Sequence, residues 1–239
     1  MADFYLEKLA NVLVDYSLGG IDFAQAWKNG QKRLLLTYEP PADELAKLVT
    51  EKVLYIGGNV FLDVVPSWHP YIYYTKASKT VLGSRPEEAL RRLDYIAARL
   101  YIRSDSNTRS LATVDPSRIA LRNKAIKPYK DRAYEVDEKL NYVIPWCVTL
   151  FPTEAYAQDM SMSYDECKDF VWKAMLLDQD DPIRAWQAVA KKQEELKEKI
   201  LDGSRIFRIV DEEDETDLTA SVESHRWVKS DGKRNFPSD

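Results

Sequence analysis

The chain has 239 residues, of which 45% are hydrophobic and 31% are charged, a composition that is ordinary for a globular protein. Its net charge of -5 and isoelectric point of about 5.3 argue against a general binder of nucleic acid, which needs a basic face for the phosphate backbone. The length fits one large domain, or one domain and part of another.

The two cysteines, Cys147 and Cys167, fall in a strand-like and a helix-like segment, and neither has a partner at the spacing of a metal site or a disulfide framework. We therefore predict a reducing, cytoplasmic compartment. The N-terminal stretch MADFYLEKLANVL lacks the basic region and apolar core of a signal peptide. No apolar run approaches the roughly 18 residues of a membrane helix, so no membrane partner is expected.

The first half of the chain alternates between amphipathic helices and short apolar strands. Leu6, Leu9 and Leu13 fall on one helical stripe, whereas the nearly continuous apolar run RLLLTY is typical of a strand buried on both faces. In chain order the patterns predict a helix over 4–16, a strand over 33–38, a helix over 45–56, a strand over 59–65, a helix over 86–97 and a strand over 99–103.

Prolines shape the predictions for the next segment. Asp115 can cap a helix whose first position is Pro116, and Pro128 should kink or end that helix. A strand is predicted over 141–150, where Pro145 indicates an edge strand or a bulge because proline cannot donate to the ladder.

Two further helix starts follow. Ser163 with Glu166 three residues later forms the pattern of a capping box, which predicts a helix over 164–177. Asp181 and Pro182 open another helix, which Gly203 ends.

After Gly203 the helical pattern stops. Two alternating segments, 204–210 and 216–222, are joined by an acidic run. We predict an α/β domain over residues 1–203, with a mostly parallel sheet and helices on both faces, and a β-rich segment over 204–239 that begins a second domain.

Glycines and acidic residues offer candidate sites that have simpler interpretations. Gly57-Gly58 leaves a helix and enters a strand, which is the order of a helix C-cap and the reverse of a dinucleotide-binding loop. The acidic run Asp211–Glu215 could hold a cation, but it lacks the spacing and the central glycine of a calcium loop. A solvated turn between strands is the favoured interpretation.

The two histidines, His69 and His225, are far apart in the sequence and lack further ligands nearby, so a zinc site is not favoured. His69 lies in the aromatic stretch WHPYIYY. Its aromatic side chains, Trp68, Tyr71, Tyr73 and Tyr74, could form a surface for a ligand or partner, or pack under a loop. Spacing alone predicts no nucleophile with its base.

Four stretches carry a resemblance to a known family. They are LANVLVDYSLGG, VDPSRIALRNKA, FPTEAYAQDMSMSYDECKDFVWKAMLLDQDDPIRAW and TDLTASVESHRWVKSDGKRNFPSD. In this order they resemble the metal-dependent aminopeptidases that include aminopeptidase T and aminopeptidase S. The likeness spans most of the chain, and the last two stretches are its most specific parts.

The resemblance implies what should follow the last stretch. In that family it runs on through Pro-x-Gly-Glu, whose glutamate is the first metal ligand, and this sequence stops at Asp239, just before that point. The expectation is therefore a second domain that is truncated before the metal ligands. No catalytic, cofactor-binding or metal-ligating residue is assigned in this chain, and the chain alone is expected to be inactive.

For the whole enzyme the resemblance implies two divalent metal ions (Co²⁺, Zn²⁺ or Mg²⁺) that activate water, and a peptide substrate with a free N-terminus. A homodimer is expected. The alternative is a non-catalytic interaction or oligomerisation domain on an aminopeptidase-like scaffold. A nucleotide-binding α/β enzyme is disfavoured because no phosphate-binding loop is present in the sequence.

Overall fold

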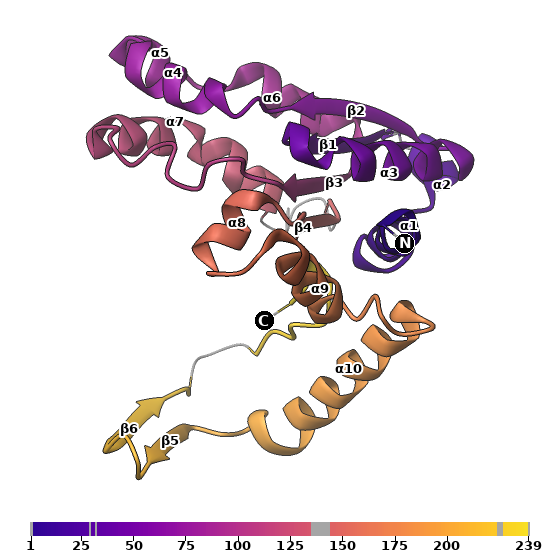
Figure 1. Cartoon of the computed structure of the whole chain (residues 1–239), viewed down its shortest axis with the longest axis vertical. Coiled ribbons are helices and arrows are strands. Elements are labelled where there is room, and N and C mark those ends of the chain that lie inside the picture. The colour runs from indigo at the N-terminus through magenta and orange to yellow at the C-terminus, as the bar shows by residue number, and fades with distance from the viewer. Residues whose placement is uncertain (1, 29, 32, 135–143, 224–226, 239) are drawn as a thin grey trace.

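The computed structural model describes residues 2–28, 30–31, 33–134, 144–223 and 227–238, and Figure 1 shows their arrangement. Its centre is a parallel sheet of five strands in the order β2-β1-β3-β4-β7. The strands are β1 (Arg33–Tyr38), β2 (Asn59–Val64), β3 (Ile96–Arg103), β4 (Trp146–Leu150) and β7 (Arg234–Phe236). The predicted α/β class with a mostly parallel sheet is confirmed.

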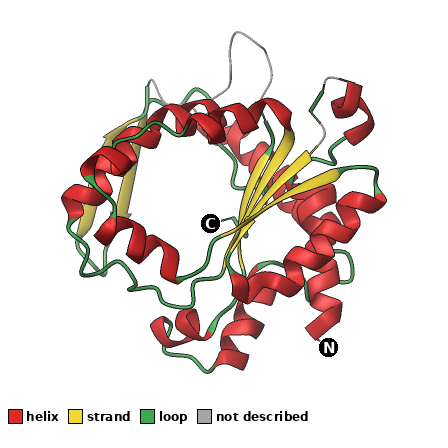
Figure 2. Ribbon diagram, turned by 90° about the horizontal axis from the view of Figure 1, so that it is seen from above, coloured by secondary structure: helices red, strands yellow, loops and turns green. Residues whose placement is uncertain are grey.

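Strand β1 shows why the sheet is covered on both faces. Leu34 and Leu36 belong to the main core, beneath α1 (Ala2–Val12) and α3 (Asp43–Tyr55), whereas Leu35 belongs to a smaller cluster with Leu93 and Ala133. Successive side chains of a strand point to opposite faces, so three buried leucines in a row need cover on both. Helix α7 (Pro116–Tyr134) supplies Ala133 to the second face, and Figure 2 shows helices on both sides of the sheet.

The sequence pattern predicts some of the remaining helices and misses others. The predicted ones are α6 (Glu87–Arg92), α9 (Tyr164–Ala174) and α10 (Pro182–Leu196). The sequence analysis missed α2 (Phe23–Lys28), α4 (Trp68–Lys76), α5 (Lys79–Leu82) and α8 (Glu154–Asp159). The missed helices have four to nine residues, and α4 buries no side chain, so they lack the repeated apolar stripe on which a helix prediction depends.

Two predictions about helix length are corrected. The helix predicted over 86–97 ends as α6 at Arg92, and after a short 3₁₀ turn the buried residues Ile96 and Ala97 already belong to β3. Of the two outcomes predicted at Pro128, the end of the helix is wrong and the kink stays a prediction, because α7 continues to Tyr134 and tertiary contacts hold the residues beyond the proline. Arg132 Nη1 donates to the carbonyl of Leu90 at 2.9 Å, and Ala133 is buried.

Of the edge strand and the bulge predicted as alternatives at Pro145, the edge strand is wrong, and the pairing of β4 with β3 runs without a register shift. Strand β4 lies between β3 and β7 and begins one residue after this proline. The carbonyl of Pro145 accepts a hydrogen bond from the Arg99 N–H at 2.9 Å, and its missing N–H falls before the first pair of the β4 ladder. Residues 141–143 of the predicted strand lie outside the described residues.

The helix starts at Ser163 and Asp181 are confirmed. Ser163 Oγ accepts from the N–H of Glu166 at 3.3 Å, and Glu166 Oε2 accepts from the N–H of Ser163 at 2.8 Å, which completes the capping box of α9. Asp181 Oδ1 accepts from the N–H of Arg184 at 3.0 Å at the start of α10.

The segment after α10 contains two different structures. Strands β5 (Ile206–Asp211) and β6 (Thr216–Ser221) form an antiparallel hairpin that stands apart from the parallel sheet (Figure 1). The chain then returns, and β7 pairs with β4 at the edge of the parallel sheet. Residues 204–239 therefore do not all lie apart from the first sheet, and the domain boundary near Gly203 stays a prediction.

Buried contacts hold β7 and the residues before it. Tyr16 Oη donates to the carbonyl of Asp231 at 2.7 Å, and burial raises the pKa of this tyrosine to about 12. The rings of Trp186 and Phe236 lie 5.3 Å apart. Gly232 has a φ of +79°, and a Cβ there would lie 2.9 Å from the Trp186 ring, so only glycine fits.

None of the helices within the described ranges has both the length and the apolar character needed to cross a membrane.

Candidate functional site

The candidate site is the crevice at the carboxyl ends of β1 and β3. From β1 the chain crosses through α3 to β2 on one side, and from β3 it crosses through α7 to β4 on the other. The direction in which the sheet grows therefore reverses between β1 and β3. In open parallel sheets, ligands bind outside the carboxyl ends of the strands at such a switch point.

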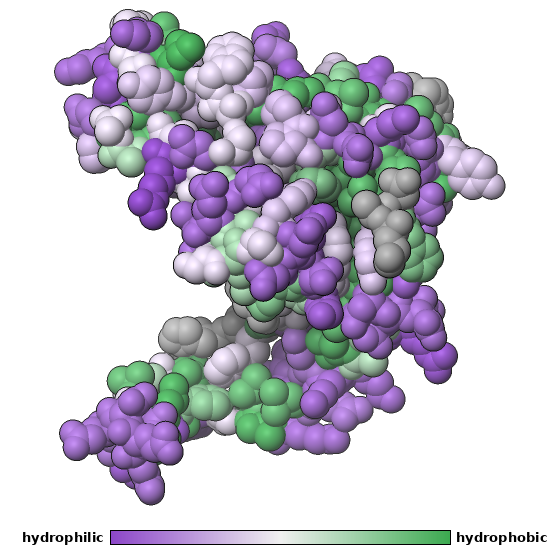
Figure 3. All heavy atoms as spheres, in the orientation of Figure 1, coloured by the Kyte–Doolittle hydropathy of each residue, from purple (hydrophilic) through white to green (hydrophobic). Residues whose placement is uncertain are grey.

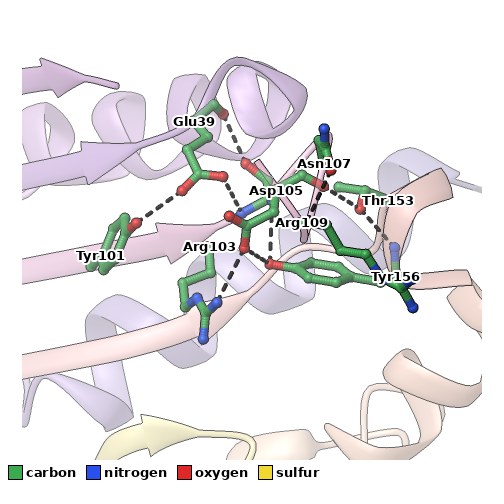
Figure 4. Close-up of polar contacts among 9 residues, drawn as sticks. Glu39, Tyr101, Arg103, Asp105, Asn107, Arg109, Thr153 and Tyr156 are labelled. Atoms are coloured by element: carbon green, nitrogen blue, oxygen red, sulfur yellow. Dashed lines mark hydrogen bonds and ion pairs between the residues drawn. The ribbon is translucent and has the colours of Figure 1, made fainter. Parts of the chain in front are cut away.

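Glu39 follows β1 directly and is buried in this crevice, with 8% of its surface exposed. Tyr101 Oη donates to Glu39 Oε1 at 2.9 Å, and the N–H of Ser104 donates to Oε2 at 3.3 Å (Figure 4). Burial raises the pKa of the Glu39 carboxyl, against the opposing effect of the Tyr101 hydrogen bond. Burial and the neighbouring Glu39 charge also raise the pKa of Tyr101, so its phenol keeps the proton that it donates.

Asp105, on the loop after β3, joins this loop to α8. Its Oδ2 atom accepts from Arg103 Nη2 at 3.2 Å and from the hydroxyl of Tyr156. Its carbonyl accepts from Thr153 Oγ1 at 2.7 Å, and Thr153 also caps the start of α8. Figure 4 shows Glu39 and Asp105 side by side. Glu39 follows β1, and Asp105 lies on the loop after β3.

A small cavity opens at these two carboxylates. It has a volume of about 30 Å³, and its lining includes Glu39 and Asp105 together with the hydroxyl-bearing residues Ser67 and Ser110. Ser67 comes from the segment after β2, so the ends of β1, β2 and β3 all contribute to the lining.

A larger open cavity adjoins the small one. Its volume is about 450 Å³, and Ser106 and Asn107 line both cavities. Its far side includes Arg109 and Asp159, which form a 3.8 Å ion pair between the loop after β3 and α8. The two cavities together form a polar crevice that carries both signs of charge.

The donor groups of the crevice do not make a metal centre. Within the described residues, no group of three or more His, Cys, Asp or Glu side chains could hold a metal ion. Arg103 already neutralises part of the charge of Asp105. The arrangement is suited instead to recognising a polar ligand through hydrogen bonds.

Within the described residues, none of the candidate residues of the sequence analysis is among those that line the two cavities, although His69 lies on α4, whose N-cap Ser67 does line the small one. The ring of His69, on α4, stacks on that of Tyr73 with the centroids 5.8 Å apart. His225 lies outside the described residues. Asp211 ends β5, and residues 212–215 form the exposed turn of the β5–β6 hairpin, as the favoured interpretation predicted. Gly57 has a φ of +83° at the end of α3, which confirms the C-cap.

The aromatic stretch is not packed under a loop. It forms α4, whose side chains are all at least partly exposed, and 60% of Trp68 is accessible. Both cysteines are free and buried, and burial raises the pKa of Cys147 to about 12, so this thiol stays protonated at neutral pH.

The sequence analysis missed Glu39 and Asp105. The available signal was their position, because each is the first or second residue after a buried strand of the parallel sheet. Carboxyl ends of such strands meet at one edge, so polar residues there are natural candidates for a site.

Comparison with known proteins gives a consistent result. The family model described as thermophilic metalloprotease (M29) matches residues 2–239. The fold is similar to that of wild-type AmpT from Thermus thermophilus, with a TM-score of 0.68 and 19% sequence identity. The match covers 100% of this chain but 60% of the AmpT chain. No curated protein matches the chain significantly.

Proposed function

Because this chain belongs to the thermophilic metalloprotease (M29) family, we propose that it is part of a metal-dependent aminopeptidase, which removes N-terminal residues from peptides. The observation that carries the proposal is the family match over residues 2–239. The AmpT-like fold over the whole chain supports it. The substrate in this proposal is a peptide with a free N-terminus, and the compartment is the cytoplasm.

The finer proposal is that the whole enzyme uses two divalent metal ions to activate water. The described residues of this chain do not fit such a centre, because no group of three or more potential ligands gathers among them. We therefore assign none of these residues to the metals. We propose instead that the ligands belong to a further part of the protein, since the chain spans 60% of the length of AmpT.

In this proposal the chain contributes the α/β domain beside the metal-bearing part. The polar crevice at the carboxyl ends of β1 and β3 is its candidate for contact with a ligand. The competing proposal is a non-catalytic interaction domain on the same scaffold. The hydrophobic residues exposed on the β5–β6 hairpin favour it, because apolar surface of this kind is typical of contact sites.

A paired assay separates the two proposals. The 239-residue chain and a longer protein that extends to the full length of AmpT, of which this chain covers 60%, are given a chromogenic aminoacyl amide, with and without a chelator. We expect no metal-dependent release by the short chain, even with added Co²⁺, Zn²⁺ or Mg²⁺, and chelator-sensitive release by the longer one. An inactive longer protein would favour the interaction domain. Metal-dependent turnover by the short chain would contradict the assignment of the ligands to another part.

A further inference from the structure

The small cavity at the switch point combines buried negative charge with unused hydrogen-bond acceptors. A carboxylate has about four lone-pair sites, and Glu39 uses two of them for Tyr101 and Ser104. Asp105 accepts both of its side-chain hydrogen bonds at Oδ2, and its Oδ1 accepts none within the described part of the chain. Acceptor capacity therefore remains on both carboxylates.

The two serines of the lining add hydroxyl groups to these acceptors. Ser67 occupies the N-cap position of α4, yet its side chain makes no capping hydrogen bond. The hydroxyl of Ser110 likewise makes no hydrogen bond with the residues that the structure describes. The cavity thus presents at least three acceptor groups toward one small space.

The volume of about 30 Å³ sets the size of the group that fits. It exceeds the roughly 10–15 Å³ that admits one water molecule, so a single ammonium group, which is of about the same size as water, fits in it. An ammonium carries three donors and a positive charge, so it complements two carboxylates and two hydroxyls. The carboxylate of Glu39 disfavours an anion at the same place, whereas the charge of Asp105 is partly neutralised by Arg103.

We propose that this crevice binds a ligand by its primary ammonium group, which is held in the small cavity between Glu39 and Asp105. The rest of the ligand extends past Asn107 into the larger cavity, whose polar lining suits amide groups. The ligand class is an amine of peptide chemistry, with the ammonium supplied by an N-terminus or by a lysine side chain. This proposal does not depend on the peptidase activity, because it concerns binding alone.

Calorimetric or NMR titration of the protein with three probes tests the proposal. L-Alaninamide offers an α-ammonium, Nα-acetyl-L-lysinamide offers a side-chain ammonium, and N-acetyl-L-alaninamide offers neither. We expect at least one ammonium probe to bind and the third probe not to bind. The two ammonium probes distinguish a peptide N-terminus from a lysine side chain as the source of the group.

Variants locate the binding. Glu39→Gln should weaken binding of the ammonium probe about tenfold or more, because it removes a charge-assisted hydrogen bond. Glu51→Gln makes the same chemical change at an exposed position of α3 and should leave the affinity unchanged. Ser67→Leu should abolish binding because its side chain fills the cavity while both carboxylates stay in place. If Glu39→Gln does not fold, Ser67→Leu still tests whether the probe binds in this cavity.

Three outcomes would overturn the proposal. One is that neither ammonium probe binds at millimolar concentration. Another is that the acetylated probe binds equally well. The third is that binding survives both Glu39→Gln and Ser67→Leu in variants whose thermal unfolding shows that they are folded.

Discussion

Glu39 combines burial with a negative charge, so its ionisation is coupled to folding. In the folded chain its pKa lies above the usual 4.5, chiefly because burial disfavours the charged form. In the unfolded chain the pKa returns to that usual value. Between the two pKa values the folded chain binds the proton more tightly, so the free energy of unfolding falls as the pH rises through this window.

We expect Glu39→Gln to remove this dependence. The stability of the wild type relative to the variant should be highest below pH 4.5 and should decrease as the pH rises through the raised pKa. Urea unfolding at a series of pH values measures the difference. Glu51→Gln controls for the loss of one surface charge. Parallel pH profiles for the wild type and Glu39→Gln would show that Glu39 ionises equally easily in both states.

At the scale of the element, the capping box of α9 is a local interaction that stabilises one helix end. Ser163 and Glu166 each satisfy a backbone N–H that has no partner within the helix. Ser67 occupies the corresponding N-cap position of α4 without making this bond. The two serines therefore form a natural comparison.

We predict that Ser163→Ala lowers the free energy of unfolding by about 1 kcal/mol, because the N–H of Glu166 loses its acceptor. Ser67→Ala should change it by less than about 0.5 kcal/mol, as is usual for an exposed position. Chemical denaturation of both variants gives the two values. Equal losses at the two positions would contradict a specific role for the capping box.

At the scale of the whole molecule, the β5–β6 hairpin exposes a large apolar surface. Figure 3 shows hydrophobic residues gathered on this part of the molecule. The large side chains exposed on the hairpin, at the end of α10 and in the helical turn that follows it (Lys197–Leu201) are Leu196, Ile200, Ile206, Ile209, Val210 and Leu218. Monomers seldom expose apolar patches larger than a few hundred Å². A two-stranded hairpin is also marginally stable by itself, so we infer that this surface is covered in solution.

We expect the chain to form a homodimer, most simply with two-fold symmetry. Light scattering should then give twice the monomer mass of 27.6 kDa. Ile209 and Leu218 face each other across the hairpin, so Ile209→Lys combined with Leu218→Glu should shift the mass toward the monomer if the hairpin forms the contact. A wild-type mass of 27.6 kDa at high concentration would contradict self-association.

Local chemistry in the sequence determined the features that depend on near neighbours. The run RLLLTY specified a strand covered on both faces, since three consecutive apolar side chains must point to alternating sides. Ser163 with Glu166, Asp181 with Pro182, and Gly57 marked helix ends, because a cap involves residues only a few positions apart. The resemblance in four stretches identified the family that the comparison shows.

Tertiary structure decided the features that join distant residues. Helix α7 continues past Pro128 because Arg132 and Ala133 are held by residues about forty to a hundred positions away in the chain. Strand β4 is internal because residues 234–236, far away in the sequence, form β7 and pair with its other edge. The crevice has the same origin, because Glu39 and Ser104 are 65 residues apart in the sequence. The parallel sheet brings them together by placing the carboxyl ends of β1 and β3 at one edge, and no periodicity within either segment records that contact.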